Sequence, residues 1–259
     1  MKKSGQNGQT SDLSMPIRAF VTGGTGAIGR QIVRELLRKG FHVDFSFNKS
    51  VEKVSDVFRE NRDHHDRLGA VELDLLGASV EGIPPDVQTV LKKTSVLVNN
   101  AATSCEQDFL DIGNTEWQQM LAINLIAPAQ LLRIAIPNMI ERNWGRVVNI
   151  VSVGGQIGGV NQAHYAASKA GLISLSKSIS NLYAGRGITC NAVSPGLIET
   201  PMSKSELSRE DGVAKVGRIP VGRVGTVEDV APIVAFLVTD EASYITGQVI
   251  NVNGGTYLG

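Results

Sequence analysis

The feature that most constrains the fold of this chain is a cluster of glycines that separates two hydrophobic periodicities near the N-terminus. Residues 17–22 (I-R-A-F-V-T) form an apolar run typical of a buried strand, and residues 28–39 carry apolar side chains at helical spacing up to Gly40. Between them lies the turn T-G-G-T-G-A-I-G, residues 22–29. Its glycines permit a tight turn and let backbone N–H groups approach a pyrophosphate at the start of the helix. With a second strand expected at 41–47, this stretch predicts a nucleotide-binding βαβ unit.

The rest of the chain repeats the alternation of strand and helix. We expect further strands at about 70–74, 95–99, 146–151, 188–193 and 248–252. We expect helices at about 50–62, 84–93, 115–140 and 227–239, and one that contains Tyr165 and ends near 184. Thr226 with Asp229 predicts a capping box. The pattern predicts an α/β fold, a single-domain Rossmann-like doubly wound parallel sheet of about seven strands flanked by helices. The irregular residues 197–225 are expected to form a lid.

Composition narrows the class of partner. Lys plus Arg and Asp plus Glu both total 25, so no net field favours nucleic acid or an anionic membrane, and small molecules are expected instead. No run of 18 apolar residues exists. We expect polar residues 1–15 to be a disordered tail, residues 16–259 to form one domain, and the location to be cytoplasmic. Cys105 and Cys190 have no metal or redox spacing, and D-H-H-D at 63–66 fits a solvated helix end, so no metal is expected.

A candidate acid/base pair lies in the segment Y-A-A-S-K. Tyr165 and Lys169 are four residues apart, so on a helix both side chains project from one face. A cation held near a phenol favours phenolate, so we expect the pKa of Tyr165 to move from about 10 toward neutrality, where it can exchange a proton with a substrate oxygen. Ser152, thirteen residues upstream, would bring a hydroxyl beside the same oxygen. Such a pair also occurs by chance in many soluble helices, so it gains weight only beside the glycine turn.

At several independent places the chain resembles the short-chain dehydrogenase/reductase family, over residues 17–257. The matching motifs are the turn from Thr22 to Gly29, Asn99-Asn100-Ala101-Ala102 after the expected fourth strand, and the set Asn124, Ser152, Tyr165 and Lys169. Ser194-Pro195-Gly196 and the ending Y-I-T-G-Q-V-I-N-V-N-G-G resemble 3-oxoacyl-acyl-carrier-protein reductases in particular. Ala27 and Ala102 stand where the family usually has glycine, and each adds a methyl group near the expected cofactor.

The resemblance implies roles for individual residues. Tyr165 would donate a proton to a ketone, Lys169 would lower the pKa of Tyr165 and hold the nicotinamide ribose, and Ser152 would orient the carbonyl. Asn124 would support a water relay, with a locally satisfied buried asparagine as the structural alternative. The expected NADP(H)-binding residues are Gly23, Thr25, Gly26, Ala27, Ile28, Gly29, Asn48, Lys49, Ser50, Asp74, Leu75, Asn100, Ala101, Tyr165, Lys169, Pro195, Gly196, Ile198 and Thr200.

The end of the second predicted strand bears on the choice of cofactor. An acidic residue there would accept the adenosine ribose 2′-OH and repel a 2′-phosphate. The expected position holds Phe47, followed by Asn48-Lys49-Ser50, two neutral donors and a cation suited to a phosphate. Ser50 could also cap the next helix. We therefore expect a preference for NADP(H).

The resemblance implies an NADP(H)-dependent oxidoreductase that reduces a ketone to a secondary alcohol, with a 3-oxoacyl thioester as substrate, acyl carrier protein as a partner and a homotetramer as the assembly. Arg186 stands where such reductases have an arginine toward the carrier, but Asn143 holds the second position, with Arg142 displaced by one. Two alternatives remain open: another carbonyl, alcohol or sugar substrate, and a non-catalytic NADP(H)-sensing regulator. The segments expected to define the substrate are 103–113, 153–162 and 197–222.

Pro128 lies inside the helix that contains Asn124, where an interior proline costs about 3 kcal/mol. Proline has no N–H, so the carbonyl of Asn124 would lose its helical donor. The sequence therefore predicts a kink at this point, and the freed carbonyl would suit a bound water.

Overall fold

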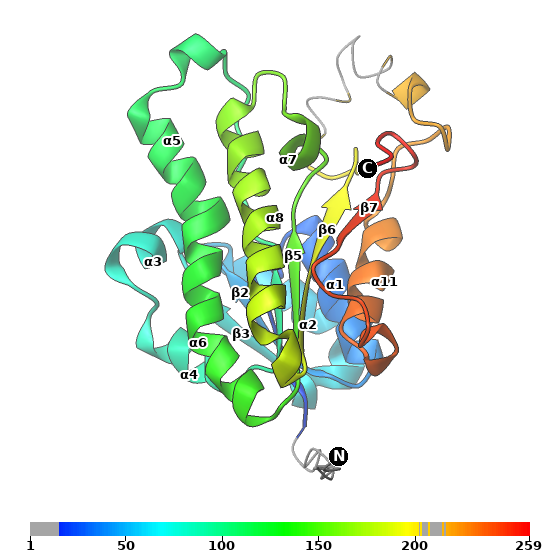
Figure 1. Ribbon diagram of the computed structural model, residues 1–259. Helices are drawn as coiled ribbons and strands as arrows, with labels where there is room; N and C mark the ends of the chain where they lie inside the picture. The colour runs from blue at the N-terminus through cyan, green and yellow to red at the C-terminus, as the bar shows by residue number, and fades with distance from the viewer. Residues whose placement is uncertain (1–15, 202, 204–206, 208–213, 215) are drawn as a thin grey trace, which may run out of the picture.

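A single parallel sheet organises the computed structural model, which describes residues 16–201, 203, 207, 214 and 216–259. Its seven strands lie in the order β3-β2-β1-β4-β5-β6-β7, with helices packed on both faces (Figure 1). This is the doubly wound, Rossmann-like α/β architecture that the alternating pattern predicts. Residues 1–15, predicted to be a disordered tail, lie outside the described residues.

All pairings between neighbouring strands are parallel. The strands are β1 (Arg18–Val21), β2 (His42–Phe47), β3 (Leu68–Glu72), β4 (Val96–Asn99), β5 (Gly145–Ile150), β6 (Ile188–Pro195) and β7 (Val249–Val252). Because helices cover both faces, successive side chains of the central strands must be buried, and β4 and β5 are buried along their whole length. The strand order reverses at β1, between β2 and β4, and ligands of such sheets bind at the carboxyl ends of strands beside this reversal.

Most helices pack into two large hydrophobic clusters on opposite faces of the sheet. The helices are α1 (Ala27–Arg38), α2 (Val51–Glu60), α3 (Leu75–Glu81), α4 (Pro85–Leu91), α5 (Asn114–Leu121), α6 (Ala127–Glu141), α7 (Gly154–Ile157), α8 (Ala163–Tyr183) and α11 (Val227–Leu237). One large cluster takes Leu36 from α1 and Val234 from α11. The other takes Leu91 from α4, Leu131 from α6 and Ile179 from α8. A smaller third cluster contains Leu172 and Ile173 of α8. Figure 1 shows α6 and α8 together on one side of the sheet and α1 and α11 on the other.

The observed elements differ from the predicted ones mainly between residues 60 and 82. α2 ends at Glu60, and a 3-10 helix follows at Arg62–Arg67 where a longer α-helix was expected. α3 was not predicted, because seven residues are too few for a clear helical periodicity. The predicted capping box is present at the start of α11, with the N–H of Thr226 donating to the Asp229 carboxylate at 2.8 Å.

The helix predicted at 115–140 runs from Asn114 to Glu141 with a break inside it. A π-helical turn at Ala122–Ile126 joins α5 to α6, and the N–H of Ala127 donates to the carbonyl of Ala122. The hydrogen-bond pattern of the α-helix is therefore interrupted just before Pro128, in a turn that contains Asn124, and the kink expected there stays a prediction. By length and composition alone this helix could cross a membrane, but half of its most apolar window is buried in the protein, as in the core helix of a soluble fold.

The irregular excursion after β6 returns to its own starting point. Ile198 forms a parallel bridge with Gly225, the N–H of Glu199 donates to the Gly225 carbonyl at 2.8 Å, and the N–H of Gly225 donates to the Leu197 carbonyl at 3.0 Å. The segment predicted as a lid, 197–225, thus has its two ends joined at the sheet. Residues 202, 204–206, 208–213 and 215 of it lie outside the described part of the chain.

Candidate active site

A cavity of about 800 Å³ lies at the carboxyl ends of β1, β4, β5 and β6, beside the reversal of strand order. It brings together most of the residues predicted from the sequence. These are Gly23, Thr25, Gly26, Ala27, Ile28, Gly29, Asn48, Asn100, Ala101, Ser152, Tyr165, Lys169, Pro195, Gly196, Ile198 and Thr200. The glycine turn and the tyrosine–lysine pair, far apart in sequence, therefore share one cleft.

The glycine turn forms a cradle of backbone with little side chain. Gly23 has φ +67°, which side chains rarely adopt, and the N–H of Gly26 donates to its carbonyl at 3.0 Å. A Cβ at Gly29 would collide with the same carbonyl, so only glycine lets α1 approach the turn so closely. No side chain caps the start of α1, and its first turn holds no acidic residue. The N–H groups and positive dipole end of α1 therefore fit a pyrophosphate.

Thr22 and Asn100 fasten this cradle to the next strand. The Thr22 hydroxyl accepts from the N–H groups of Asn100 and Ala101, each at 2.9 Å. In return the Asn100 amide donates to the carbonyls of Thr22 at 2.9 Å and Gly23 at 3.3 Å. Asn100 thus fixes the shape of the glycine turn from the end of β4.

The tyrosine end of the cleft is built from side chains. Tyr165 and Lys169 both project from α8 into the cavity, with the Lys169 ammonium 5.8 Å from the centre of the Tyr165 ring. The ammonium donates to the Ile150 carbonyl at the end of β5 at 2.8 Å. Ser152 hydrogen-bonds to Tyr165, and its Oγ accepts from the N–H of Gly154 at 3.2 Å. The expected grouping of serine, tyrosine and lysine is therefore present.

The electrostatics of this group differ from the sequence argument, which expected Lys169 to lower the pKa of Tyr165. Burial raises the pKa of Tyr165, and the Ser152 hydrogen bond only partly opposes it. Burial also lowers the pKa of Lys169 to about 8. Desolvation exceeds the expected charge effect because both groups leave water while the ammonium is directed at the Ile150 carbonyl. The protein alone thus favours the protonated phenol, the form that can donate a proton.

Asn124 lies behind the cavity and connects two of its walls. It is fully buried; its Oδ1 accepts from the N–H of Thr103, and its Nδ2 donates to the Thr103 carbonyl, both at 2.9 Å. Nδ2 also lies 3.1 Å from the Ser168 hydroxyl, which donates to the Tyr165 carbonyl at 2.7 Å. Thr103 and Ser168 belong to the loop after β4 and to α8, so the Asn124 side chain holds that loop against α8. The water relay expected near Asn124 stays a prediction.

Four predicted cofactor residues do not line the cavity. Lys49 stands in a left-handed turn with φ +58°, and Ser50 precedes α2. Asp74 caps α3 by accepting from the N–H of Leu76 at 3.1 Å, and Leu75 is buried in the core beneath. Their roles stay predictions. Lys53, one turn into α2, lines the cavity instead and was missed, because the sequence alone does not show how α2 is oriented after the Lys49 turn.

The remaining wall comes from the segments expected to define the substrate. Outside the predicted residues it includes Ala102, Ser104, Cys105, Glu106, Gln162, Leu197, Pro201 and Ser203. Half of these side chains are polar, those of Ser104, Glu106, Gln162 and Ser203. Ala102 belongs to the Asn99–Ala102 motif, whereas the other seven residues carry no motif and only their segments were predictable.

The D-H-H-D segment holds its histidines against protein atoms. His65 Nε2 lies 2.9 Å from the Phe58 carbonyl, and His64 Nδ1 lies 2.9 Å from the Arg67 guanidinium. Within the described residues, no group of three or more His, Cys, Asp or Glu side chains could hold a metal ion. His164 is buried against the Trp117 ring, with 6.0 Å between the ring centroids.

Comparison with known proteins agrees with this geometry. Residues 24–257 match the family model described as Enoyl-(Acyl carrier protein) reductase. The 3-oxoacyl-[acyl-carrier-protein] reductase FabG of Salmonella typhimurium is 36% identical over 247 residues, covering 93% of this chain and 97% of the relative. That of Staphylococcus aureus is also 36% identical, covering 95% and 100%.

Solved structures give the same fold with different names. A protein of Beutenbergia cavernae assigned as an NAD(P) dependent gluconate 5-dehydrogenase, with bound NADP, has a TM-score of 0.84 and 34% identity, covering 93% of this chain and 96% of that chain. One of Agrobacterium tumefaciens assigned as a 2-deoxy-D-gluconate 3-dehydrogenase, with bound NADP, has a TM-score of 0.82 and 27% identity at the same coverage. With the cleft and its tyrosine–lysine pair, these matches make the chain an oxidoreductase of the short-chain dehydrogenase/reductase family.

Proposed function

We propose that this chain is an NADP(H)-dependent reductase of 3-oxoacyl thioesters, which it converts to secondary alcohols. The observation that carries the proposal is the convergence of Ser152, Tyr165 and Lys169 on the cavity that also contains the glycine turn. A hydride carrier and a proton donor are what reduction of a ketone requires. The thioester class is supported by the 36% identity to FabG reductases over nearly the whole of both chains.

In the proposed reaction the nicotinamide supplies a hydride to the carbonyl carbon. Tyr165 donates its phenolic proton to the carbonyl oxygen, which gains negative charge as the hydride arrives. With substrate bound, the Ser152 hydroxyl would turn its one hydrogen from Tyr165 to the same carbonyl oxygen, which its place beside Tyr165 allows. The Lys169 ammonium, fixed by the Ile150 carbonyl, stabilises the phenolate that remains. Asn124 supports this group through Ser168.

The cofactor proposed for this chain is NADP(H), as in the structural relatives with bound NADP. β2 ends in Phe47 rather than an acidic residue, so no carboxylate stands there to repel a 2′-phosphate. Asn48 and Lys53 line the adjacent end of the cavity and offer an amide and a cation to such a phosphate. The predicted donors Lys49 and Ser50 flank this position.

We also propose acyl carrier protein as a partner, but the candidate contact residues and the active-site cleft lie at opposite edges of the sheet within one protomer. Arg186, the candidate carrier contact, is exposed beyond the C-terminal end of α8, and Arg142 ends α6. Arg142 precedes β5 and Arg186 precedes β6, at the amino edge of the sheet, whereas Ser152 and Tyr165 line the cavity at its carboxyl edge. A carrier bound at Arg186 would therefore reach the cleft of another protomer more easily, which fits the homotetramer that we also propose. We expect this assembly in the cytoplasm.

A specific observation favours a second substrate class, a polyhydroxylated ketone or sugar acid. Ser104, Glu106 and Gln162 give the substrate end of the cavity hydrogen-bonding groups. The solved structures assigned as gluconate dehydrogenases have the same fold at up to 34% identity. Hydroxyl groups would suit this polar wall better than a long acyl chain does.

Oxidation of NADPH by the purified protein tests these proposals. Acetoacetyl-CoA, acetoacetyl-acyl-carrier-protein and a ketogluconate should be compared at matched concentrations, with NADH in parallel. We expect the highest kcat/KM with an acetoacetyl thioester and NADPH, and little gain from the carrier. Activity on the ketogluconate but on neither thioester would show that the substrate is a polyhydroxylated ketone or sugar acid and not a thioester. Binding of NADPH with no turnover of any ketone would support the non-catalytic sensor instead.

A further inference from the structure

The side chain of Gln156 joins three elements beside the active site. Its Nε2 donates to the Ser194 hydroxyl at 2.9 Å and to Oδ1 of Asn251 at 2.6 Å. Gln156 belongs to α7, Ser194 to β6 and Asn251 to β7. An amide nitrogen has two hydrogens, so both of its donors are used here.

The two hydrogen bonds from Gln156 to Ser194 and Asn251 are here called the Gln156 clip. Gln156 and Ser194 both lie close to the catalytic groups. α7 begins two residues after Ser152, and the N–H of Gly154 donates to the Ser152 hydroxyl at 3.2 Å. A Cβ at Gly155 would lie 2.8 Å from Cβ of Lys169, so α7 packs directly on the catalytic helix. Ser194 is fully buried and precedes Pro195 in the wall of the cofactor cleft.

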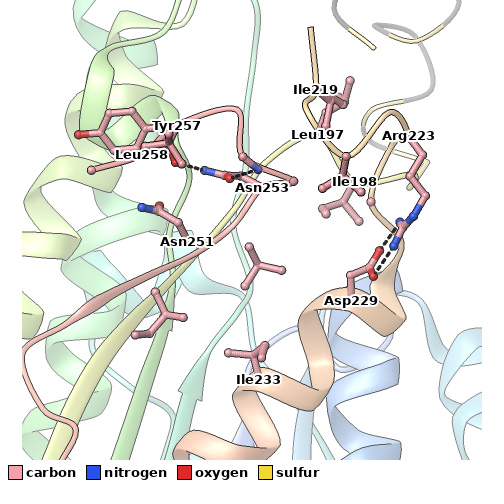
Figure 2. A pocket seen from close by; sticks show the side chains of 17 residues that line it. Leu197, Ile198, Ile219, Arg223, Asp229, Ile233, Asn251, Asn253, Tyr257 and Leu258 are labelled. Carbon is pink, nitrogen blue, oxygen red and sulfur yellow. Dashed lines mark hydrogen bonds and ion pairs between the residues drawn. The ribbon is translucent and has the colours of Figure 1, made fainter. Parts of the chain in front are cut away.

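The other end of the clip lies at the edge of the sheet. Asn251 lines a second cavity of about 550 Å³ between β7, α11 and the C-terminus, here called the C-terminal cavity. Figure 2 shows Asn251 on the opposite side of this cavity from Arg223 and Asp229, whose ion pair closes with hydrogen bonds of 2.7 and 2.8 Å. The last strand is thereby connected to the turn that carries Ser152.

We propose that Gln156 is a positioning residue, whose paired hydrogen bonds to Ser194 and Asn251 hold Ser152 in place beside Tyr165. It acts through the turn and not by contact with substrate, since it is absent from the described residues that line the active-site cavity. α7 has only four residues, and the N–H groups of residues 155–158 all donate to carbonyls of the same turn. The N–H of Val153, just before α7, donates to the Pro195 carbonyl of β6 at 3.4 Å, a long hydrogen bond. The side-chain clip supplies the missing constraint. This inference rests on the proposed role of Ser152.

The clip should affect the titration of Tyr165. The hydrogen bond from Ser152 lowers the pKa of Tyr165, so displacement of Ser152 would raise that pKa. The other titratable groups that share the cavity are Lys169 on α8, Cys105 and Glu106 after β4, and Lys53 on α2. In the described part of the chain, none of them hydrogen-bonds to Gln156, Ser194 or Asn251, and the Lys169 ammonium is separately held by the Ile150 carbonyl at 2.8 Å.

Gln156→Met tests the proposal, because it keeps the length of the side chain and removes both donors. Gln130→Met is the matched control, since it removes a single glutamine bond, 3.1 Å to the Ser79 carbonyl, on α6. Asn251→Asp keeps the acceptor and should behave like the parent. Ketone reduction, NADPH binding and melting temperature should be measured for all three. Tyrosinate absorbance against pH should be recorded as the difference from the matching Tyr165→Phe protein.

We expect Gln156→Met to lose about tenfold to a hundredfold in kcat, since about 1 Å of misplacement can cost a hundredfold, with NADPH affinity unchanged. The Tyr165 titration should move to higher pH in Gln156→Met only. An unmoved titration would overturn the proposal, even if rate and melting temperature both fell. If Gln156→Met does not fold, Asn251→Leu takes its place under the same criteria. The titration needs no substrate, so inactivity of the parent would reject the proposed function without affecting this test.

Discussion

The two ends of the active-site cleft are built in opposite ways. At the glycine turn the site is backbone, and what matters is the lack of side chains at Gly23 and Gly29. At the tyrosine end the site is a set of side chains, Ser152, Tyr165 and Lys169, held by atoms from distant parts of the chain. The first end should therefore fail when an atom is added, and the second when one is removed.

Removing one atom at the tyrosine end should have the largest effect. Tyr165→Phe deletes the hydroxyl and its proton while leaving the glycine turn intact. We expect kcat to fall by about 10²–10⁴-fold, the usual loss of general acid catalysis, with NADPH affinity preserved. Steady-state kinetics and a fluorescence titration with NADPH measure the two quantities. A folded variant that keeps more than a tenth of the parental rate would contradict the role of Tyr165.

Adding one atom at the glycine end should impair binding. In Gly29→Ala the new methyl group would collide with the Gly23 carbonyl and approach the Asn100 amide to 2.7 Å. We expect a loss of stability of about 1–3 kcal/mol from overpacking, together with weaker NADPH binding. Gly185→Ala is the control, because a Cβ there meets nothing within 4 Å. Equal melting temperatures and NADPH affinities for the two variants would show that the turn is not the close approach described.

Burial of Lys169 should make the folded protein less stable near pH 8 than near pH 10. Lys169 is charged in the unfolded chain below about 10.5, but its folded pKa is about 8. Between these values the unfolded state binds more protons, so the free energy of unfolding should rise with pH, by at most about 3 kcal/mol. Lys169→Met should flatten this rise, whereas Lys92→Met, at an exposed position, should not. Denaturant unfolding at pH 7.5 to 10.5 gives the slopes, and parallel slopes for parent and Lys169→Met would refute the assignment.

The adenosine end of the cleft allows a smaller test. We expect Lys53→Ala to raise KM for NADPH about tenfold, as one charge-assisted phosphate contact of about 1.4 kcal/mol is lost, with little change for NADH. Lys49→Ala is the matched lysine, four residues away and outside the cavity wall. A larger effect at Lys49 than at Lys53 would show that Lys49, the residue expected from the sequence, binds the phosphate.

The smallest effect is expected at the π-helical turn. Pro128→Ala supplies an N–H that can take the Asn124 carbonyl from the water expected to bind there. We therefore expect a folded, equally or more stable protein whose kcat is lowered severalfold. Pro137→Ala, inside the same helix but beyond the turn, should leave kcat unchanged. If both variants match the parent across pH 6–9, Pro128 has a structural role only.

The contrast between the two ends also explains what the sequence could predict. The role of Gly23 and Gly29 could be predicted because the glycines are visible in the sequence and lie between a strand pattern and a helix pattern. The proximity of Tyr165 and Lys169 could be predicted because residues four apart on a helix project from one face. Nothing local, in contrast, indicates that Asn124 meets Thr103, or that Gln156 meets Asn251, 95 residues later. Such partners follow from strand order, which the sequence gives only in outline.

Local backbone conformation limited the prediction elsewhere. The left-handed turn at Lys49 displaces the expected cation and leaves Lys53 in the cavity wall. The short helix α3 uses Asp74 as its cap. The predicted lowering of the Tyr165 pKa was wrong for the protein alone, because helical spacing says nothing about how far water is excluded.

The bridge between Ile198 and Gly225 makes the stretch between them a closed loop with fixed ends. Its length and composition can change without altering where β6 ends or where α11 begins. Doubling the length of such a loop costs only about 0.6 kcal/mol of closure entropy. Related chains could therefore differ in this segment, and through it in substrate, while Ser152, Tyr165 and Lys169, which lie outside it, stay in place. Exchange of the segment between two such chains would alter specificity in the laboratory.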